Sequence, residues 1–271
     1  NENGYRVRLA NPAAMEQYNG LKDTDDETDT FFLTEMSRLG ILPEGYIYPK
    51  EERPVRDLLR RRLFLVQQRT AHLLSFQSLV SRQRGEQIGS NQIQKLWPKE
   101  VGQFFDDERL VLMGATNIEV IRFLTQQIRQ IESAVLAEVR LRPEYEKLLT
   151  VPGIGKILAL TIMLETGEIN RFKKVGNYTS YCRCVKSSRT SNEKRKGENN
   201  RKNGNRYLNW AYIEAANFIR RYCPEAKRWY QRKLTRSMQV VATKALASKL
   251  CKACYFIIKD QVEFDVKKIF G

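Results

Sequence analysis

The sequence is poor in several features that common protein classes require. Its 271 residues include one histidine, His72, and because this residue lies beside the apolar stripe of an expected helix, we interpret it as a packed side chain. A Ser–His or Cys–His mechanism therefore has no evident base. No apolar run approaches the roughly 20 residues needed to span a bilayer. The first residues lack the basic-then-apolar pattern of a signal peptide. They also lack a starting Met and read as an alternating strand, Tyr5-Val7-Leu9, so we expect residue 1 not to be the natural start.

Cysteine is also scarce, and its pattern argues against a disulfide framework. The odd count of five, without a signal peptide, favours a reducing cytosol. Two pairs, Cys182-x-Cys184 and Cys251-x-x-Cys254, match the ligand types of a four-thiolate zinc site. The second pair, however, has the i,i+3 spacing of one apolar helix face. We therefore favour a packed core over zinc for these thiols, and Cys223 is the fifth.

Acidic residues are outnumbered, since Lys and Arg total 47 against 31 Asp and Glu, for a formal net charge of +16. An excess of this size predicts a polyanionic partner, and nucleic acid is the commonest because Lys and Arg displace counterions from phosphates. No segment combines a basic face with a large apolar one, which argues against a membrane surface. The alternative is a merely solvated cationic surface.

One short run opposes this balance, KDTDDETDTFFLTEM at residues 22–36. Like charges at such density repel one another unless a cation lies between them. The run precedes a helix that the apolar spacing predicts through Leu39, with Gly40 at its end. Asp26 and Asp29 then lie on one face at or just before the helix start. Either they form an exposed loop tip, or they are part of a metal site.

Two long amphipathic helices are predicted next. The first begins near Glu52 and ends at Gly85, and a polar stretch, residues 85–100, reads as a linker. The second carries apolar residues at the 3,4 spacing of a coiled-coil seam, namely Ile121, Leu124, Ile128, Ile131 and Val135. The sequence leaves open whether this seam joins two chains or packs inside one.

The stretch LLTVPGIGKILALTIMLE, residues 148–165, has the pattern of a helix-hairpin-helix motif. One helix is expected to end at Leu149 and the next to start at Lys156. Gly153 and Gly155 would let backbone N–H groups approach a phosphate, Lys156 would add charge, and Ile154 would enter the core. This order favours sequence-nonspecific backbone binding over a purely structural corner.

A strongly basic segment follows, CRCVKSSRTSNEKRKGENNRKNGNRYLNW, and it lacks an apolar period. Such a stretch is expected to form a mobile loop until an anion orders it. Long loops within a domain are usually functional. Its expected nucleic-acid contacts are Lys194, Arg195, Lys196, Arg201, Lys202 and Arg206.

Three of these stretches, in this order, resemble the DEDD-type transposases of bacterial insertion sequences, a group that includes pilin-gene invertases and RNA-guided recombinases. They are Asp26-x-x-Asp29 with its helix, residues 148–172, and the basic loop closing on Gly204-Asn205 before an Ala-rich helix. The resemblance implies an N-terminal RuvC-like (RNase-H-like) domain in which four carboxylates bind Mg²⁺. Asp26 and Asp29 match the third and fourth of these, and the first two are expected upstream of Asn1.

The resemblance also implies a serine nucleophile that attacks a DNA phosphodiester. Counting back from Gly204-Asn205 gives Ser191. Two positions depart from the family pattern, since Asn192 stands where a glycine is usual and Asn209 where an arginine is common. Ser187 and Ser188 therefore remain competing candidates.

Together these observations predict a mostly α protein. Residues 1–95 would be the C-terminal part of a RuvC-like α/β domain, residues 96–145 a helical, coiled-coil dimerisation region, and residues 146–271 an all-α helix-hairpin-helix domain with the basic serine loop. The implied function is DNA cleavage and rejoining by a bacterial, cytoplasmic, nucleoid-associated transposase. Its expected partners are duplex DNA, a structured guide RNA and further copies in a homodimer or homotetramer. The alternative is a non-catalytic nucleic-acid-binding protein.

Overall fold

A computed structural model describes residues 7–12, 15, 25–138, 142–185, 189–191, 194–197 and 203–271. The described chain is mostly helical, as predicted. It divides into two compact units, residues 1–50 and 51–271, and each is described by itself. Helices on both sides of the predicted boundaries after residues 95 and 145 pack together within the second unit, and those boundaries stay predictions. Among the described helices, none has both the length and the apolar character that a bilayer-spanning segment needs.

The first unit contains one described helix, α1 (Asp26–Arg38). It ends where the sequence predicted, because Leu39 caps it and Gly40 adopts a left-handed φ of 72°. Ala10 and Glu44 form an isolated antiparallel bridge, and residues 7–9 form no strand. Tyr5 lies outside the described residues. Since the described part of this unit holds no sheet, the expected RuvC-like α/β remnant is not confirmed.

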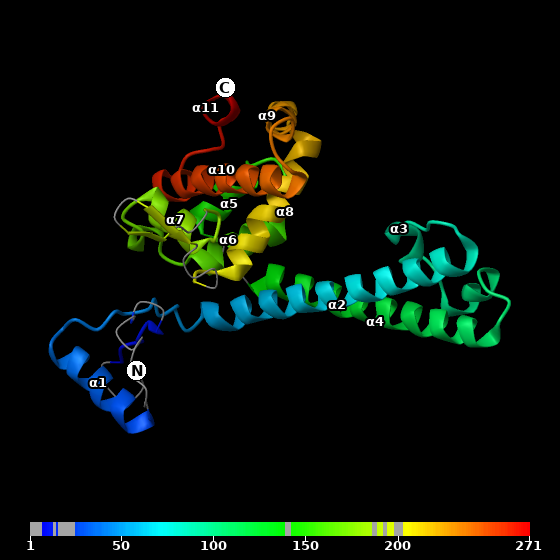
Figure 1. The fold of residues 1–271 in the computed structure, drawn as a ribbon, viewed down its shortest axis with the longest axis horizontal. Coiled ribbons are helices and arrows are strands. Elements are labelled where there is room, and N and C mark those ends of the chain that lie inside the picture. Colours follow the sequence, from blue (N-terminus) through cyan, green and yellow to red (C-terminus); the bar gives the residue numbers. More distant parts are fainter. Residues whose placement is uncertain are drawn as a thin grey trace. The chain divides into compact units, whose positions relative to one another are not determined.

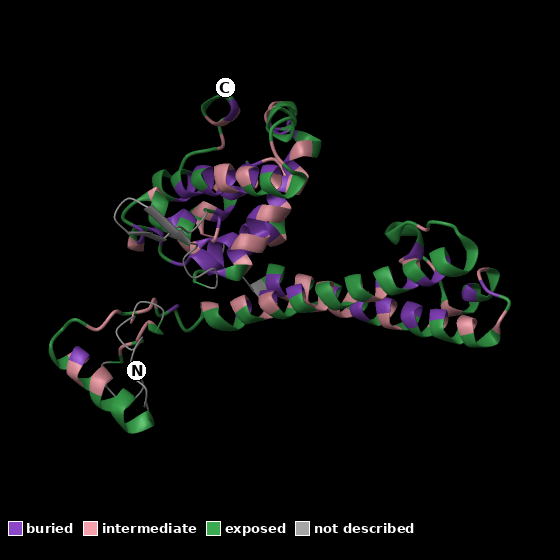
Figure 2. Cartoon of the chain, in the orientation of Figure 1, coloured by how far each residue is buried: buried purple, intermediate pink, exposed green. Residues whose placement is uncertain are grey.

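The second unit begins with an antiparallel helical hairpin of α2 (Glu52–Arg84) and α4 (Glu108–Glu138). Gly85 ends α2 in a left-handed conformation, at the predicted position. Figure 2 shows buried positions along the faces that the two helices turn toward each other. The predicted seam lies on this face: Ile121 and Val135 are fully buried, and Ile128 is 3% exposed. Its apolar side chains therefore pack inside the chain, which was the second of the two alternatives.

The stretch expected to be a linker closes the far end of this hairpin. It folds into α3 (Ser90–Ile93) and the 3₁₀ helix η3 (Pro98–Gln103). Ile93 and Val101 are fully buried against Phe76 and Ile118. The segment is polar on average but provides two core side chains, and this is why a composition-based reading misses it.

The remaining helices of the second unit form a bundle (Figure 1). Its core contains side chains from most of its helices, together with Val55 and Leu59 of α2. Tyr178 and Tyr212 are fully buried there and share a 2.6 Å hydrogen bond between their hydroxyls. The elements are α5 (Pro143–Leu149), α6 (Lys156–Thr166), η4 (Ile169–Arg171), α7 (Val175–Tyr181), α8 (Arg206–Tyr222), α9 (Pro224–Leu234), α10 (Gln239–Asp260) and α11 (Val266–Phe270).

Two short strands, β1 (Arg189–Ser191) and β2 (Lys194–Gly197), lie between α7 and α8. They pair antiparallel, with Thr190 opposite Arg195 and Ser191 opposite Lys194. The sequence predicted a mobile loop that an anion orders, and within it the structure forms this short hairpin; the mobility stays a prediction. A hairpin satisfies its backbone groups across the ladder and needs no apolar period to form.

Candidate functional site

The predicted helix-turn-helix corner has the expected boundaries, with α5 ending at Leu149 and α6 starting at Lys156. Ile154 is 3% exposed and enters the bundle core, as predicted. The two glycines differ in their surroundings. Gly153 has a φ of +94°, and a Cβ there would lie 2.5 Å from the backbone N of Ile219 in α8. Its lack of a side chain thus serves the close packing of the turn against α8.

Gly155 faces open space, since a Cβ at this position would meet no heavy atom within 4 Å. It is the N-cap residue of α6, and no side chain caps the helix. Lys156, the next residue, is exposed. An uncapped helix start beside a lysine is a suitable arrangement for an anion. Phosphate binding at this corner stays a prediction, and it now depends on Gly155 and Lys156.

Hydrogen bonds join the two ends of the basic segment where it leaves and rejoins the bundle. Arg183, in a left-handed conformation with φ 54°, donates from Nε to the carbonyl oxygens of Asn203 and Gly204, both at 3.0 Å. The backbone N of Asn205 donates to the carbonyl oxygen of Tyr181 at 2.6 Å. Gly204 has a φ of +90°, and a Cβ there would overlap the Tyr181 carbonyl oxygen. The residues from Arg183 to Asn205 are named the basic loop below.

Several predicted site residues lie on the hairpin of this loop. Ser191 and Lys194 form the last pair of the β1–β2 ladder, and Arg195 and Lys196 follow along β2. Arg206 begins α8 and donates to the hydroxyl of Tyr207 at 2.8 Å. Four predicted or competing residues lie outside the described ones, namely Ser187, Ser188, Arg201 and Lys202.

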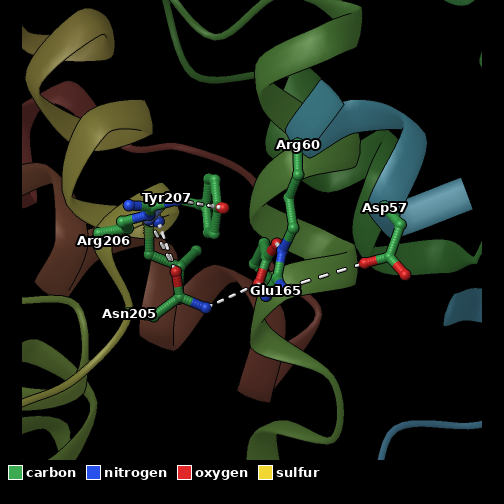
Figure 3. Close-up of polar contacts among 7 residues, drawn as sticks. Asp57, Arg60, Glu165, Asn205, Arg206 and Tyr207 are labelled. Carbon is green, nitrogen blue, oxygen red and sulfur yellow. Dashed lines mark hydrogen bonds and ion pairs between the residues drawn. The ribbon is translucent and has the colours of Figure 1, made fainter. Parts of the chain in front are cut away.

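A buried carboxylate lies next to the base of the loop. Glu165, near the end of α6, is 1% exposed. Arg60 of α2 donates to it twice, from Nε to Oε1 at 2.5 Å and from Nη2 to Oε2 at 2.8 Å. Asn205 donates from Nδ2 to Oε2 at 2.7 Å. Figure 3 shows Arg60 and Asn205 on the two sides of Glu165, so that one carboxylate of α6 joins α2 of the hairpin to the start of α8.

The partners of Glu165 are themselves fixed. The Asn205 side-chain oxygen caps α8 by accepting from the backbone N of Tyr207 at 2.8 Å and of Leu208 at 3.1 Å. The Arg60 guanidinium lies over the Tyr207 ring, 4.4 Å from its centroid. The hydrogen bonds that Arg60 donates to the Glu165 carboxylate raise the pKa of Arg60, which keeps the guanidinium charged. A bidentate, charge-assisted pair of this kind is among the stronger interactions in proteins.

Sequence reasoning missed this network, although it contained a signal. Glu165 is the one charged residue after Lys156 in the helix KILALTIMLET, where most of the other side chains are apolar. A carboxylate on a buried helix requires a cationic or hydrogen-bonding partner. The identity of that partner depends on the tertiary structure, because Arg60 precedes Glu165 by more than a hundred residues.

The acidic run has a local structural role in the described residues. Asp25 is the N-cap of α1, and its Oδ1 accepts from the backbone N and the hydroxyl of Thr28, both at 2.7 Å. These hydrogen bonds lower the pKa of Asp25. Asp26 and Asp29 are exposed in the first turn, where the helix dipole favours negative charge. Across the described parts of the chain, no group of three or more His, Cys, Asp or Glu side chains could hold a metal ion.

The cysteines and the histidine belong to packed regions, as predicted. All five thiols are free and buried, and burial raises the pKa of Cys254 to about 12. His72 lies at the α2–α4 interface, with Nδ1 3.0 Å from the side-chain oxygen of Asn117.

Residues 145–231 match the family model of the IS116/IS110/IS902 transposases. This region begins in α5 and ends in α9, so it includes the basic loop, Glu165 and Asn205. Over 275 aligned residues the chain is also 23% identical to a probable family 20 transposase of Pseudomonas aeruginosa, covering 95% of this chain and 78% of that protein. The chain is related to the insertion-sequence transposases. The resemblance predicted from the sequence is confirmed at this level.

Proposed function

We propose that this insertion-sequence transposase cleaves and rejoins DNA strands with Ser191 as the nucleophile. The observation that carries the proposal is the register of the β1–β2 hairpin, in which Ser191 pairs with Lys194 within the region that matches the family model. Ser191 and the basic residues that begin β2 therefore belong to one short hairpin.

The proposed chemistry is an exchange of phosphate esters. The Ser191 hydroxyl loses its proton and its oxygen forms a bond to phosphorus, while the bond from phosphorus to the leaving deoxyribose oxygen breaks. The leaving oxygen takes up a proton, and a phosphoserine linkage conserves the bond energy. Attack by a second DNA hydroxyl on this linkage rejoins the strand and releases Ser191. Lys194, Arg195 and Lys196 are proposed to stabilise the charge that develops on the phosphate oxygens.

Duplex DNA is the proposed principal partner. The proposed contacts are Gly155 and Lys156 at the start of α6, with Lys194, Arg195, Lys196, Arg201, Lys202 and Arg206 on and after the loop. Gly153 packs against α8 and would act through the geometry of the turn. The family resemblance adds a structured guide RNA and a homodimer or homotetramer to the proposal. The net charge of +16 supports a polyanionic partner.

Magnesium is proposed as the metal, as the resemblance implies. Asp26 and Asp29 provide carboxylate oxygens, the ligand type that Mg²⁺ prefers, and they lie three residues apart on α1. Two side chains do not complete a site, and the described residues add no third ligand to them. When bound there, Mg²⁺ would supply positive charge that neutralises phosphate charge.

Covalent trapping tests the proposal. The full-length protein is incubated with DNA carrying its insertion-sequence ends, then denatured, and the protein–DNA adduct is measured. Ser191→Ala is expected to abolish the adduct and leave DNA affinity nearly unchanged, because one hydroxyl contributes little to binding. Ser187→Ala and Ser188→Ala are the matched controls and should retain the adduct.

Two results would contradict the assignment. If Ser191→Ala still forms the adduct while Ser187→Ala or Ser188→Ala does not, the nucleophile is another serine of the loop. If the wild-type protein binds DNA and forms no adduct, the non-catalytic DNA-binding function is the better description.

A further inference from the structure

We propose that Glu165 is a positioning residue for the basic loop, and that it acts through Asn205 to orient Ser191 for attack. This inference rests on the function proposed above. Glu165 lies in α6, outside the loop, and it is shielded from DNA: it is 1% exposed, and both carboxylate oxygens accept hydrogen bonds from protein donors.

The first step of the argument is that Asn205 is the point where the loop joins the bundle. Its backbone N donates to Tyr181, its side-chain oxygen caps α8, and its side-chain nitrogen donates to Glu165. These bonds use an N–H donor and the oxygen acceptor of the side chain in one orientation. A rotation of the amide would break the α8 cap and the contact with Glu165 together. The returning end of the loop is therefore fixed in position and direction.

The second step is that only an ionised carboxylate suits the place of Glu165. The group receives two hydrogen bonds from the Arg60 guanidinium and one from the Asn205 amide. A neutral amide of the same shape would turn an N–H group toward one of these donors. It would also leave Arg60 without its carboxylate partner. The contact that fixes Asn205 thus depends on the charge of Glu165.

The third step concerns the effect on chemistry. Reaction rates depend steeply on the placement of the attacking atom, and displacements of about 1 Å can cost a hundredfold. Along the sequence, the hairpin with Ser191 lies between Arg183 and Asn205, the residues that hold the two ends of the loop. DNA affinity comes from many phosphate contacts and is less sensitive to such a displacement. A positioning role therefore predicts a slower reaction with little change in binding.

A donor–acceptor exchange tests the proposal. Glu165→Gln removes the carboxylate, and Asn205→Asp places a second carboxylate beside Glu165, where the two repel. In the double variant the new carboxylate at position 205 can still cap α8, since Asp is a favoured N-cap residue. It can also accept from the new amide at position 165, whose oxygen remains available to Arg60. The exposed Glu146→Gln of α5 is the matched control for removal of one negative charge.

Three quantities are measured on the full-length protein: the rate of adduct formation, the Kd for DNA, and hydrogen exchange of the Asn205 amide, with the Ile154 amide as internal reference. Glu165→Gln is expected to slow adduct formation by about tenfold or more and to leave the Kd for DNA within about threefold of the wild-type value. Hydrogen exchange should become faster at the Asn205 amide and stay unchanged at the Ile154 amide. Adduct formation by Asn205→Asp should be slower still. The double variant should return toward the wild-type rate and exchange, and Glu146→Gln should match the wild type.

The outcomes separate this inference from the proposed function. If the wild type forms no adduct, the proposed function fails, and Asn205 exchange still tests the positioning role. Unchanged Asn205 exchange and an unchanged rate in Glu165→Gln would overturn the inference. The inference would also be overturned if the double variant formed the adduct no faster than the slower of the two single variants. This test applies even if Glu165→Gln does not fold, because swapping the donor and the acceptor should then restore folding.

Discussion

Replacing Gly153 by alanine tests whether the first glycine of the α5–α6 turn serves packing or ligand binding. Two costs add at this position. The φ of +94° is disfavoured for a residue with a Cβ, and the Cβ would lie 2.5 Å from the Ile219 N and 3.0 Å from the Phe218 carbonyl carbon. These neighbours are helix backbone, so they cannot turn aside as a flexible side chain would.

The size of the effect follows from both costs. A left-handed conformation costs about 1–2 kcal/mol for a non-glycine residue, and overpacking adds about 1–3 kcal/mol. The expected destabilisation is thus roughly 2–5 kcal/mol, which corresponds to a Tm decrease of roughly 4–20 °C in a domain of this size. Gly155→Ala is the matched control, because its Cβ meets open space. As an N-cap change it should cost about 0.5–1 kcal/mol.

Thermal unfolding followed by circular dichroism measures the difference, and DNA binding is measured below the lower Tm. Gly153→Ala should melt well below Gly155→Ala. Gly155→Ala should weaken DNA binding more, since its Cβ would stand where a phosphate approaches the start of α6. A Gly153→Ala variant that melts within about 1 °C of the wild type would refute the packing role, given the Tm sensitivity expected for a domain of this size. Equal DNA affinity of Gly155→Ala and the wild type would refute phosphate binding at this turn.

The remaining predictions concern charge, packing and pH. Neutralising Lys194, Arg195 and Lys196 together should weaken DNA binding and reduce the log–log salt slope by about 0.9 for each phosphate that the protein no longer neutralises; an unchanged slope would show that these residues do not bind phosphates. Ile128→Asp should destabilise the α2–α4 hairpin by more than about 3 kcal/mol in urea unfolding, because it buries an unpaired charge, whereas an unchanged midpoint would contradict internal packing of this 3% exposed residue. Burial raises the pKa of Cys254 to about 12 from an ordinary 9.0. Its contribution to the free energy of unfolding is therefore fully present below pH 9.0 and is lost as the pH rises toward 12. Rapid labelling of Cys254 in the native protein by a thiol reagent at pH 8 would contradict its burial.

Local signals in the sequence determined much of the secondary structure. Gly40 and Gly85 end their helices because glycine readily adopts the left-handed conformation that a helix end requires. The boundaries of α5 and α6 follow from the Pro-Gly-Ile-Gly turn, and the apolar spacing identified the buried faces of α2 and α4. These features depend on neighbours within about one helical turn, and the sequence contains all of that information.

Tertiary structure decided which surface each residue meets. The seam of α4 packs on α2 of the same chain, and a 3,4 pattern is the same for a partner helix in either chain. Gly153 and Gly155 are alike in sequence, but α8 covers only the first of them. Glu165 receives its hydrogen bonds from Arg60 and Asn205, which are distant in the sequence in opposite directions. Pairings at such separations depend on how the helices pack, so no local pattern could have predicted them.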